Sequence, residues 1–175
     1  MVDSKDNLKI ISFYRFVRIK NVSKIKIILD DFLKNRDIKG TVLLSSEGIN
    51  GSLSGNEKEL FIAIVYIKKN LNIRKLNFKS NNVSFFPFKK MKIKLKKEIV
   101  TLGAGKININ KLSAKHIHPR DWNKTIKQKR IKLIDVRNPY EIKIGKFSKS
   151  INPSTTSFRQ FPEKFKKLKI NKNET

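Results

Sequence analysis

The chain of 175 residues is long enough for one full domain or two small ones, and an apolar content of 38% supports modest cores. It carries no cysteine, which excludes disulfides and thiolate metal sites within the chain, and no apolar run approaches the roughly 18 residues of a membrane helix. The N-terminal segment is polar and acidic rather than signal-like. We therefore expect a cytoplasmic protein with no membrane association and no disulfide-linked partner.

The sequence is strongly basic, with 41 Lys and Arg residues against 14 Asp and Glu and a formal net charge of +27. Such a field attracts polyanions, and nucleic acid is the obvious partner. Lys far outnumbers Arg, and Ile and Asn are abundant too, a pattern typical of AT-rich codon usage spread over every surface. The high positive charge is thus explained either by nucleic-acid binding or by codon usage. The positions at which lysines cluster therefore carry more information than the number of lysines.

The first half of the chain shows alternating strand and helix signals. Residues 8–19 are rich in β-branched and aromatic residues and predict a strand. Ser23 is a candidate cap for a helix with apolar residues at spacings of three and four, and residues 41–44 predict a second strand. The apolar face of that first helix comprises Ile25, Ile28, Leu29, Phe32 and Leu33.

Further along, Asn50-Gly51 predicts a tight turn into a short partner strand at residues 52–54. Asn56 is expected to cap a second helix, and residues 83–95 predict a last strand. The resulting β-α-β-β-α-β order is the ferredoxin-like α+β pattern, here over residues 7–98. The apolar face expected for the second helix is Leu60, Phe61, Ile64, Val65 and Ile67.

The second half is predicted to begin an α/β domain. Residues 99–112 contain two Gly and no helical period and predict a connector. Pro119 suits the first turn of a helix, residues 131–136 form a nearly continuous apolar run typical of a buried parallel strand, and Phe161, Phe165 and Leu168 have helical spacing. These elements are too few to close a doubly wound sheet, so we expect residues 113–175 to be an incomplete α/β domain.

A lysine cluster near residue 90 is the clearest physical signal. In a strand, period two places Met91, Ile93 and Leu95 on one face and the intervening lysines on the other. The functional interpretation is a contact face for an RNA backbone, and the structural alternative is a charged edge that prevents strand aggregation. The candidate RNA-binding residues of this cluster are Lys89, Lys90, Lys92, Lys94, Lys96 and Lys97.

Four weaker motifs have structural alternatives. Residues 47–51 suggest a phosphate-binding loop, although a hairpin turn explains both glycines more simply. His116 and His118 have metal-ligand spacing, but no third ligand lies nearby in sequence, which favours a surface or capping role, and no metal is predicted. Arg159, between aromatic residues, is a further candidate RNA contact or part of a hydrophobic staple.

The fourth motif combines Asp135, Arg137 and Glu141 at the end of the predicted strand. We expect Arg137 to pair with Glu141 across the turn and Asp135 to accept backbone N–H bonds. Arg137 lining an anion pocket is the functional alternative.

Several strings together carry a family resemblance: SFYRFV, KGTVLLSSEGINGSLSG, FKKMKIKLKKEIVTLG, DWN, LIDVRNPYEIKIGKF and INPSTTSFRQFPE. Their order and spacing, over residues 8–168, resemble the rhodanese-type tRNA uridine hydroxylases. That resemblance implies an acylphosphatase-like domain facing tRNA, followed by the first part of a rhodanese-like domain with Asp135, Arg137 and Glu141 in its scaffold.

The resemblance also implies an activity, the oxygen-dependent conversion of the wobble uridine of tRNA to 5-hydroxyuridine, with dioxygen as co-substrate and no evident bound cofactor. The cysteine essential to that family would lie beyond Thr175, so no catalytic residue is expected in these 175 residues, which should be inactive alone. Two alternatives stay open: a rhodanese-type sulfurtransferase, and a non-enzymatic RNA-binding fragment.

Overall fold

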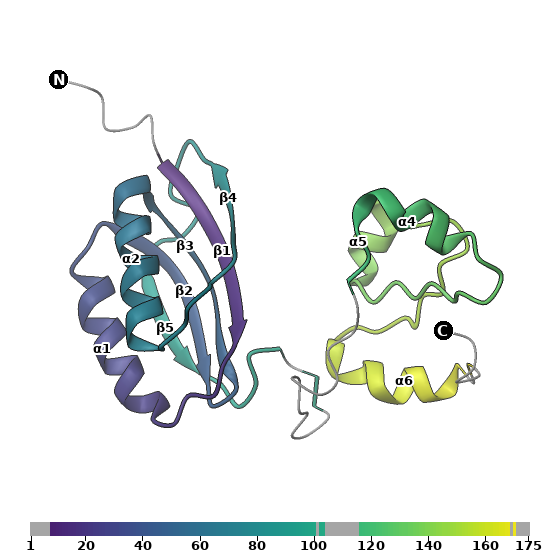
Figure 1. Cartoon of the computed structure of the whole chain (residues 1–175), viewed down its shortest axis with the longest axis horizontal. Coiled ribbons are helices and arrows are strands. Elements are labelled where there is room, and N and C mark those ends of the chain that lie inside the picture. Colours follow the sequence, from purple (N-terminus) through teal and green to yellow (C-terminus); the bar gives the residue numbers. More distant parts are fainter. Residues whose placement is uncertain (1–7, 101, 104–115, 169, 171–175) are drawn as a thin grey trace. The chain divides into compact units, whose positions relative to one another are not determined.

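A computed structural model describes residues 8–100, 102–103, 116–168 and 170, and divides the chain into two compact units, Met1–Ile99 and Val100–Thr175. We refer to them as the N-terminal and C-terminal units (Figure 1). The expected connector at residues 99–112 and the start of the second half at residue 113 lie largely outside the described residues.

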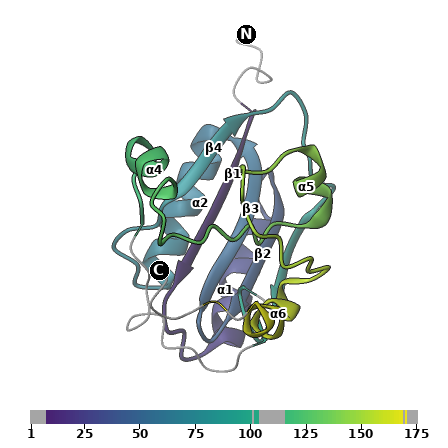
Figure 2. The same ribbon diagram turned by 90° about the vertical axis from the view of Figure 1, so that its right-hand side faces the viewer.

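The N-terminal unit is a five-stranded sheet covered on one face by two helices (Figure 1). Its elements are β1 (Leu8–Phe16), α1 (Val22–Lys34), β2 (Ile38–Ser45), β3 (Gly48–Asn56), α2 (Glu57–Asn70), β4 (Phe78–Asn82) and β5 (Met91–Leu95). The strand order is β4-β1-β3-β2-β5, with β5 parallel to β2 and the other neighbours antiparallel. Figure 2 shows the first four of these strands side by side in that order. This is the predicted ferredoxin-like α+β arrangement, extended at one edge by β5.

Both helices begin at asparagine caps. Asn56 accepts the backbone N–H of Lys58 at 3.0 Å and begins α2, as predicted. Asn21 accepts the N–H of Lys24 at 2.9 Å and begins α1, so the assignment of that cap to Ser23 was wrong by two residues. The Asn21 side chain reaches a free N–H of the first turn, whereas Ser23 already lies within the helix.

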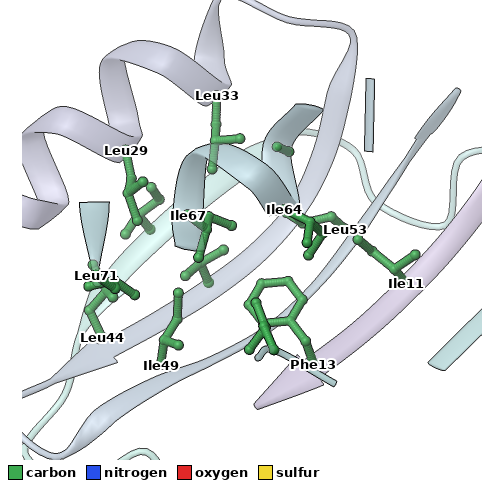
Figure 3. Packing of buried hydrophobic residues seen from close by; sticks show 14 of the residues in the cluster. Ile11, Phe13, Leu29, Leu33, Leu44, Ile49, Leu53, Ile64, Ile67 and Leu71 are labelled. Carbon is green, nitrogen blue, oxygen red and sulfur yellow. The ribbon is translucent and has the colours of Figure 1, made fainter. Parts of the chain in front are cut away.

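The core lies between the helices and the sheet (Figure 3). Leu29 and Leu33 of α1 and Ile67 of α2 are fully buried, facing Leu44 and Ile49 of the sheet. Burying a side chain of this size contributes about 1.5–3 kcal/mol, so this layer stabilises the packing of both helices on the sheet.

Two residues expected on the apolar face of α2 are instead exposed: Phe61 is 67% exposed and Val65 48%. The buried stripe comprises Leu60, Ala63, Ile64 and Ile67. The sequence pattern counted every apolar residue, but a helix lying on a sheet buries only a stripe about one third of its circumference wide.

The predicted turn at Asn50-Gly51 is wrong, because both residues lie within β3. The chain reverses at Ser46-Glu47, where Ser45 pairs with Gly48. Gly51 is required for space: a Cβ there would lie 2.9 Å from Cζ of Phe13 on the neighbouring strand. The glycine therefore reflects close packing across the sheet and not turn formation.

The last predicted strand, residues 83–95, was also placed wrongly in part. Only residues 91–95 of it form a strand, β5, and residues 78–82 form β4, whose side chains are all exposed. The N–H of Val83 donates to the carbonyl of Leu8 at 3.0 Å, which is the end of the pairing with β1. Polar, exposed β4 lacks the apolar pattern from which strands are predicted.

The C-terminal unit contains α4 (Pro119–Ile126), α5 (Pro139–Ile144), a 3-10 helix η1 (Phe158–Gln160) and α6 (Phe161–Lys167). The helices expected after Pro119 and around Phe165 are confirmed. The predicted strand at residues 131–136 is reduced to one parallel bridge between Ile134 and Ile151. Among the described residues of this unit no large apolar side chain is buried, so little apolar packing holds such a strand in place.

None of the described helices is long and apolar enough to cross a membrane.

Candidate nucleic-acid interface

The lysine cluster lies on and around β5, at one edge of the sheet. Met91 is 8% exposed and Ile93 7%, whereas Lys92 and Lys94 between them are exposed. The expected alternation is therefore present over residues 91–94. Leu95, expected on the buried face, is 46% exposed, because the strand ends there. Lys90 and Lys96 flank the strand, and Lys89 and Lys97 lie outside it.

Strand register places Lys92 and Lys94 on the face of the sheet opposite the helices, which we call the open face. Paired positions on neighbouring strands form a row across this face. From β5 to β4 the row consists of Lys92, Thr41, Ser52, Ser12 and Lys79. This row runs across all five strands. Neighbouring strands lie about 4.8 Å apart, so its two lysines stand about 19 Å apart at their Cα atoms.

A second row joins Lys94, Leu43, Asn50 and Tyr14, and a third joins Lys39, Ser54, Ile10 and Asn81. The middle of the open face carries small polar side chains, and the hydroxyl oxygens of Ser12 and Ser52 lie 2.7 Å apart. The row through Ser12 and Ser52 is thus a polar strip with one lysine at each end, Lys92 on β5 and Lys79 on β4.

No carboxylate occupies an open-face position of the five strands, over the residues that the structure describes. Three acids of the helical layer form ion pairs: Asp30 with Lys26 and Lys34, Glu57 with Lys9, and Glu59 with Arg36. Burial would raise the pKa of Asp30, but hydrogen bonds from the two lysines and their positive charges more than offset it, so the pKa lies below its ordinary value. With no strand carboxylate to pair with them, the lysines of the open face are available to an external anion.

One end of the open face is closed by the chain as it leaves the sheet. The Glu47 carboxylate accepts the backbone N–H of Ile99 at 2.7 Å, and the Asn50 amide donates to the Ile99 carbonyl at 3.3 Å. The N–H groups of Val17 and Ile19 donate to the same hairpin turn, at 2.9 and 3.0 Å. Glu47 and Asn50 therefore form hydrogen bonds with backbone groups of neighbouring segments, and the alternative of a phosphate-binding loop finds no support.

In the C-terminal unit, Arg137 pairs with Asp135 and not with Glu141 as expected. Its Nε and Nη2 donate to the two carboxylate oxygens at 2.9 and 2.7 Å, and Nη2 also donates to the carbonyl of Gly145 at 2.7 Å. Glu141 instead accepts the N–H of Asn138 at 3.0 Å and completes the cap of α5. The planar guanidinium group can donate two parallel hydrogen bonds to one carboxylate, and the carboxylate of Asp135 lies only two residues away on the same turn.

These contacts fix the charges of the pair. The hydrogen bonds from the Arg137 side chain hold the pKa of Asp135 below its ordinary value, and the hydrogen bonds to Asp135 raise the pKa of Arg137. As expected, Asp135 also accepts the backbone N–H of Arg137, at 3.2 Å. With its guanidinium engaged in this way, Arg137 is part of the turn, which is the structural role that we favoured.

The remaining candidates are also located. Arg159 is exposed on η1, beside a stacked pair formed by Phe158 and Phe161 with ring centroids 5.7 Å apart. His118 caps α4, because its ring nitrogen accepts the N–H of Arg120 at 3.3 Å, which confirms the capping role.

Sequence reasoning missed four open-face residues: Tyr14, Phe16, Lys39 and Lys79. Tyr14 and Phe16 share the strand parity of Ser12, opposite to that of the buried Ile11 and Phe13. The alternation in SFYRF was therefore a usable signal for two exposed aromatic residues on one face. Lys39 and Lys79 required the strand register, which local sequence does not provide.

The fold and this face define a ferredoxin-like α+β domain with a basic open sheet. Residues 8–99 match the sequence model described as the UPF0176 acylphosphatase like domain, and the chain belongs to this family. A curated relative from Pelagibacter ubique (strain HTCC1062), named tRNA uridine(34) hydroxylase, is 40% identical over 166 residues, which are 93% of this chain and 54% of the relative. The chain thus spans about half the length of that relative.

Two solved structures were also compared. An acylphosphatase from Coxiella burnetii is 11% identical with a TM-score of 0.43 and covers 54% of this chain and 100% of its own. An acylphosphatase from Bacillus subtilis is 14% identical with a TM-score of 0.39 and covers 49% of this chain and 97% of its own. Sequence identities and TM-scores this low add nothing to the fold assignment, which rests on the strand order and the family match.

Proposed function

We propose that the chain is part of a cytoplasmic enzyme that hydroxylates the wobble uridine of tRNA in an oxygen-dependent reaction, and that its N-terminal unit supplies a tRNA-binding surface. The observation that carries this proposal is the 40% identity, over 93% of the chain, to a protein named for that reaction. The activity is proposed for the whole protein and the binding surface for residues 8–99.

The open face supports RNA as the partner. Lys90, Lys92, Lys94 and Lys96 follow one strand and its flanks, and no strand position on the described part of that face is acidic. Polyanion binding releases counterions from the nucleic acid, at about 0.7 per neutralised phosphate of a single strand, so a row of lysines contributes affinity regardless of base sequence. The same residues also blunt a sheet edge, but that role does not require lysines on several strands.

We further propose that residues 113–175 are the first part of a rhodanese-like domain, with Asp135, Arg137 and Glu141 in its scaffold. Support comes from the turn that these residues hold: a bidentate ion pair at its start and a capping box at the beginning of α5. The 175 residues contain no cysteine, so a step that requires a thiolate needs a group from outside them.

The test is mass spectrometry of tRNA nucleosides from a strain lacking the complete gene. Loss of 5-hydroxyuridine and its derivatives, restored by the complete reading frame, is the expected result. Unchanged 5-hydroxyuridine would overturn the proposal, and loss of a thiolated uridine instead would indicate a sulfurtransferase. Expression of the 175 residues alone in the same strain should leave 5-hydroxyuridine absent.

A further inference from the structure

We propose that the open face binds unpaired nucleotides of RNA, with Tyr14 as the platform on which a base stacks. This inference rests on the proposed function and specifies which part of an RNA the face receives.

Tyr14 is exposed in a way that folding does not explain. Its side chain is 59% exposed, although it lies in β1, a central strand of the sheet. Its strand neighbours at the opposite parity, Ile11 and Phe13, are buried under the helices, so the phenol ring points to the open face. A large aromatic ring left there is available to a ligand.

The ring of Tyr14 is held by its neighbour. Phe16, two residues along the same strand face, contacts it edge-on, with centroids 6.4 Å apart and planes at 77°. Such T-shaped pairs contribute about 0.5–1.5 kcal/mol beyond area burial and restrict ring orientation. A base that stacks on Tyr14 therefore meets a ring that is already oriented.

The surroundings of Tyr14 suit a nucleotide. The Ser12–Ser52 hydroxyl pair occupies the next row and offers hydrogen-bond groups to a base or ribose, whereas the amide of Asn50, directly opposite Tyr14 on β3, already donates to the Ile99 carbonyl. Lys79 and Lys92 stand at the two ends of that row, where phosphates extending from a stacked base can be neutralised. Aromatic residues between cations are the recurring arrangement of surfaces that bind single strands.

Unpaired nucleotides fit this face better than a duplex. A base inside a helix has both faces covered by its neighbours, whereas unpaired bases in loops are free to stack on aromatic side chains. Phe86 does not compete for this role, because the ammonium group of Lys39 already lies 4.2 Å from its ring centroid. Phe78 of β4 is also exposed, at 47%, but it pairs with Phe13 and so lies on the helical side of the sheet. Among the described open-face strand residues, Tyr14 therefore presents the most exposed aromatic ring for stacking.

The test uses the 175-residue chain and a fluorescent oligouridylate of about ten nucleotides. Tyr14→Ala should weaken binding roughly 5- to 150-fold, the range for loss of one stacked base, with no change in the salt dependence. Tyr14→Phe should retain affinity. Tyr140→Ala, at a residue with 65% exposure in the C-terminal unit, is the matched control and should bind like the parent. A duplex of the same length should not discriminate Tyr14→Ala from the parent.

A second readout reports stacking directly. A 2-aminopurine in the oligonucleotide should be quenched on binding to the parent chain and to Tyr14→Phe, but not by Tyr14→Ala. If lysine variants lose affinity and Tyr14→Ala does not, the stacking proposal is overturned while RNA binding stands. If the parent chain binds no RNA, both this proposal and the binding role of the N-terminal unit are overturned.

Discussion

Replacing Lys90, Lys92, Lys94 and Lys96 together with Gln should reduce the salt dependence of RNA binding. Lys92 and Lys94 are exposed on the open face, and the other two flank the same strand. Glutamine preserves length and removes only the charge. Because like charges along one strand face repel each other, the substitution should not cost stability.

The expected magnitude follows from the number of phosphates lost. Four contacts at about 0.7 each lower the slope of log affinity against log salt by about 2.8, and two contacts lower it by about 1.4. Between about 50 and 200 mM salt, the parent should lose about 50-fold more affinity than the variant if all four lysines contact phosphate. The difference is about 7-fold if only the two strand lysines do.

Fluorescence anisotropy with a labelled tRNA at several salt concentrations measures this slope. The matched control removes four charges from exposed lysines of the helical layer and the loop that follows it, Lys24, Lys58, Lys69 and Lys75. That control should keep the parental slope. Equal slopes for the parent and the open-face variant would refute the assignment of phosphate contacts to β5, and equal losses in both variants would show that binding follows total charge.

Three other outcomes follow from the structure. Gly51→Ala should destabilise the N-terminal unit by about 1–3 kcal/mol, because its Cβ would lie 2.9 Å from Phe13, and an unchanged urea midpoint would contradict this. Asp30 has a lowered pKa when folded, so its stabilisation is present above its ordinary pKa of 3.8 and is lost as the pH falls through the lower folded value. Asp30→Asn should therefore be less stable than the parent near neutral pH, by roughly 0.5 kcal/mol, and equal to it in strong acid; a constant difference across the titration would refute the linkage. The isolated C-terminal unit should show no cooperative thermal transition by circular dichroism, because none of its described large apolar residues is buried to offset a chain entropy of about 1–2 kcal/mol per residue.

The order of the N-terminal elements was predictable because the apolar residues follow strand and helix periods. Leu29 and Leu33 mark one helix and Ile64 and Ile67 the other, and all four lie in the core. The lysines of β5 were predictable for the same reason, since period two alone assigns Lys92 and Lys94 to one face.

The errors share a different physical origin. Gly51 was misassigned because the residue that requires its small size, Phe13, is distant in sequence and adjacent only in the folded sheet. Arg137 was given the wrong partner because two carboxylates lie within reach along the chain, and only the backbone of the turn determines that Asp135 is the nearer. The polar strip across the open face depends on register among five strands, and single-sequence patterns do not contain that information.

The anchoring of Ile99 determines the C-terminal boundary of this domain for truncations and fusions. The last strand finishes at Leu95, yet the backbone is held four residues further on, by Glu47 at its N–H and Asn50 at its carbonyl. Four extended residues span up to about 14 Å. A linker whose length is counted from Leu95 is therefore credited with up to about 14 Å that the anchored segment does not provide. A boundary placed at Leu95 would also leave the carboxylate of Glu47 without the backbone partner that it has here, whereas one placed after Ile99 keeps the hairpin and its closing segment together.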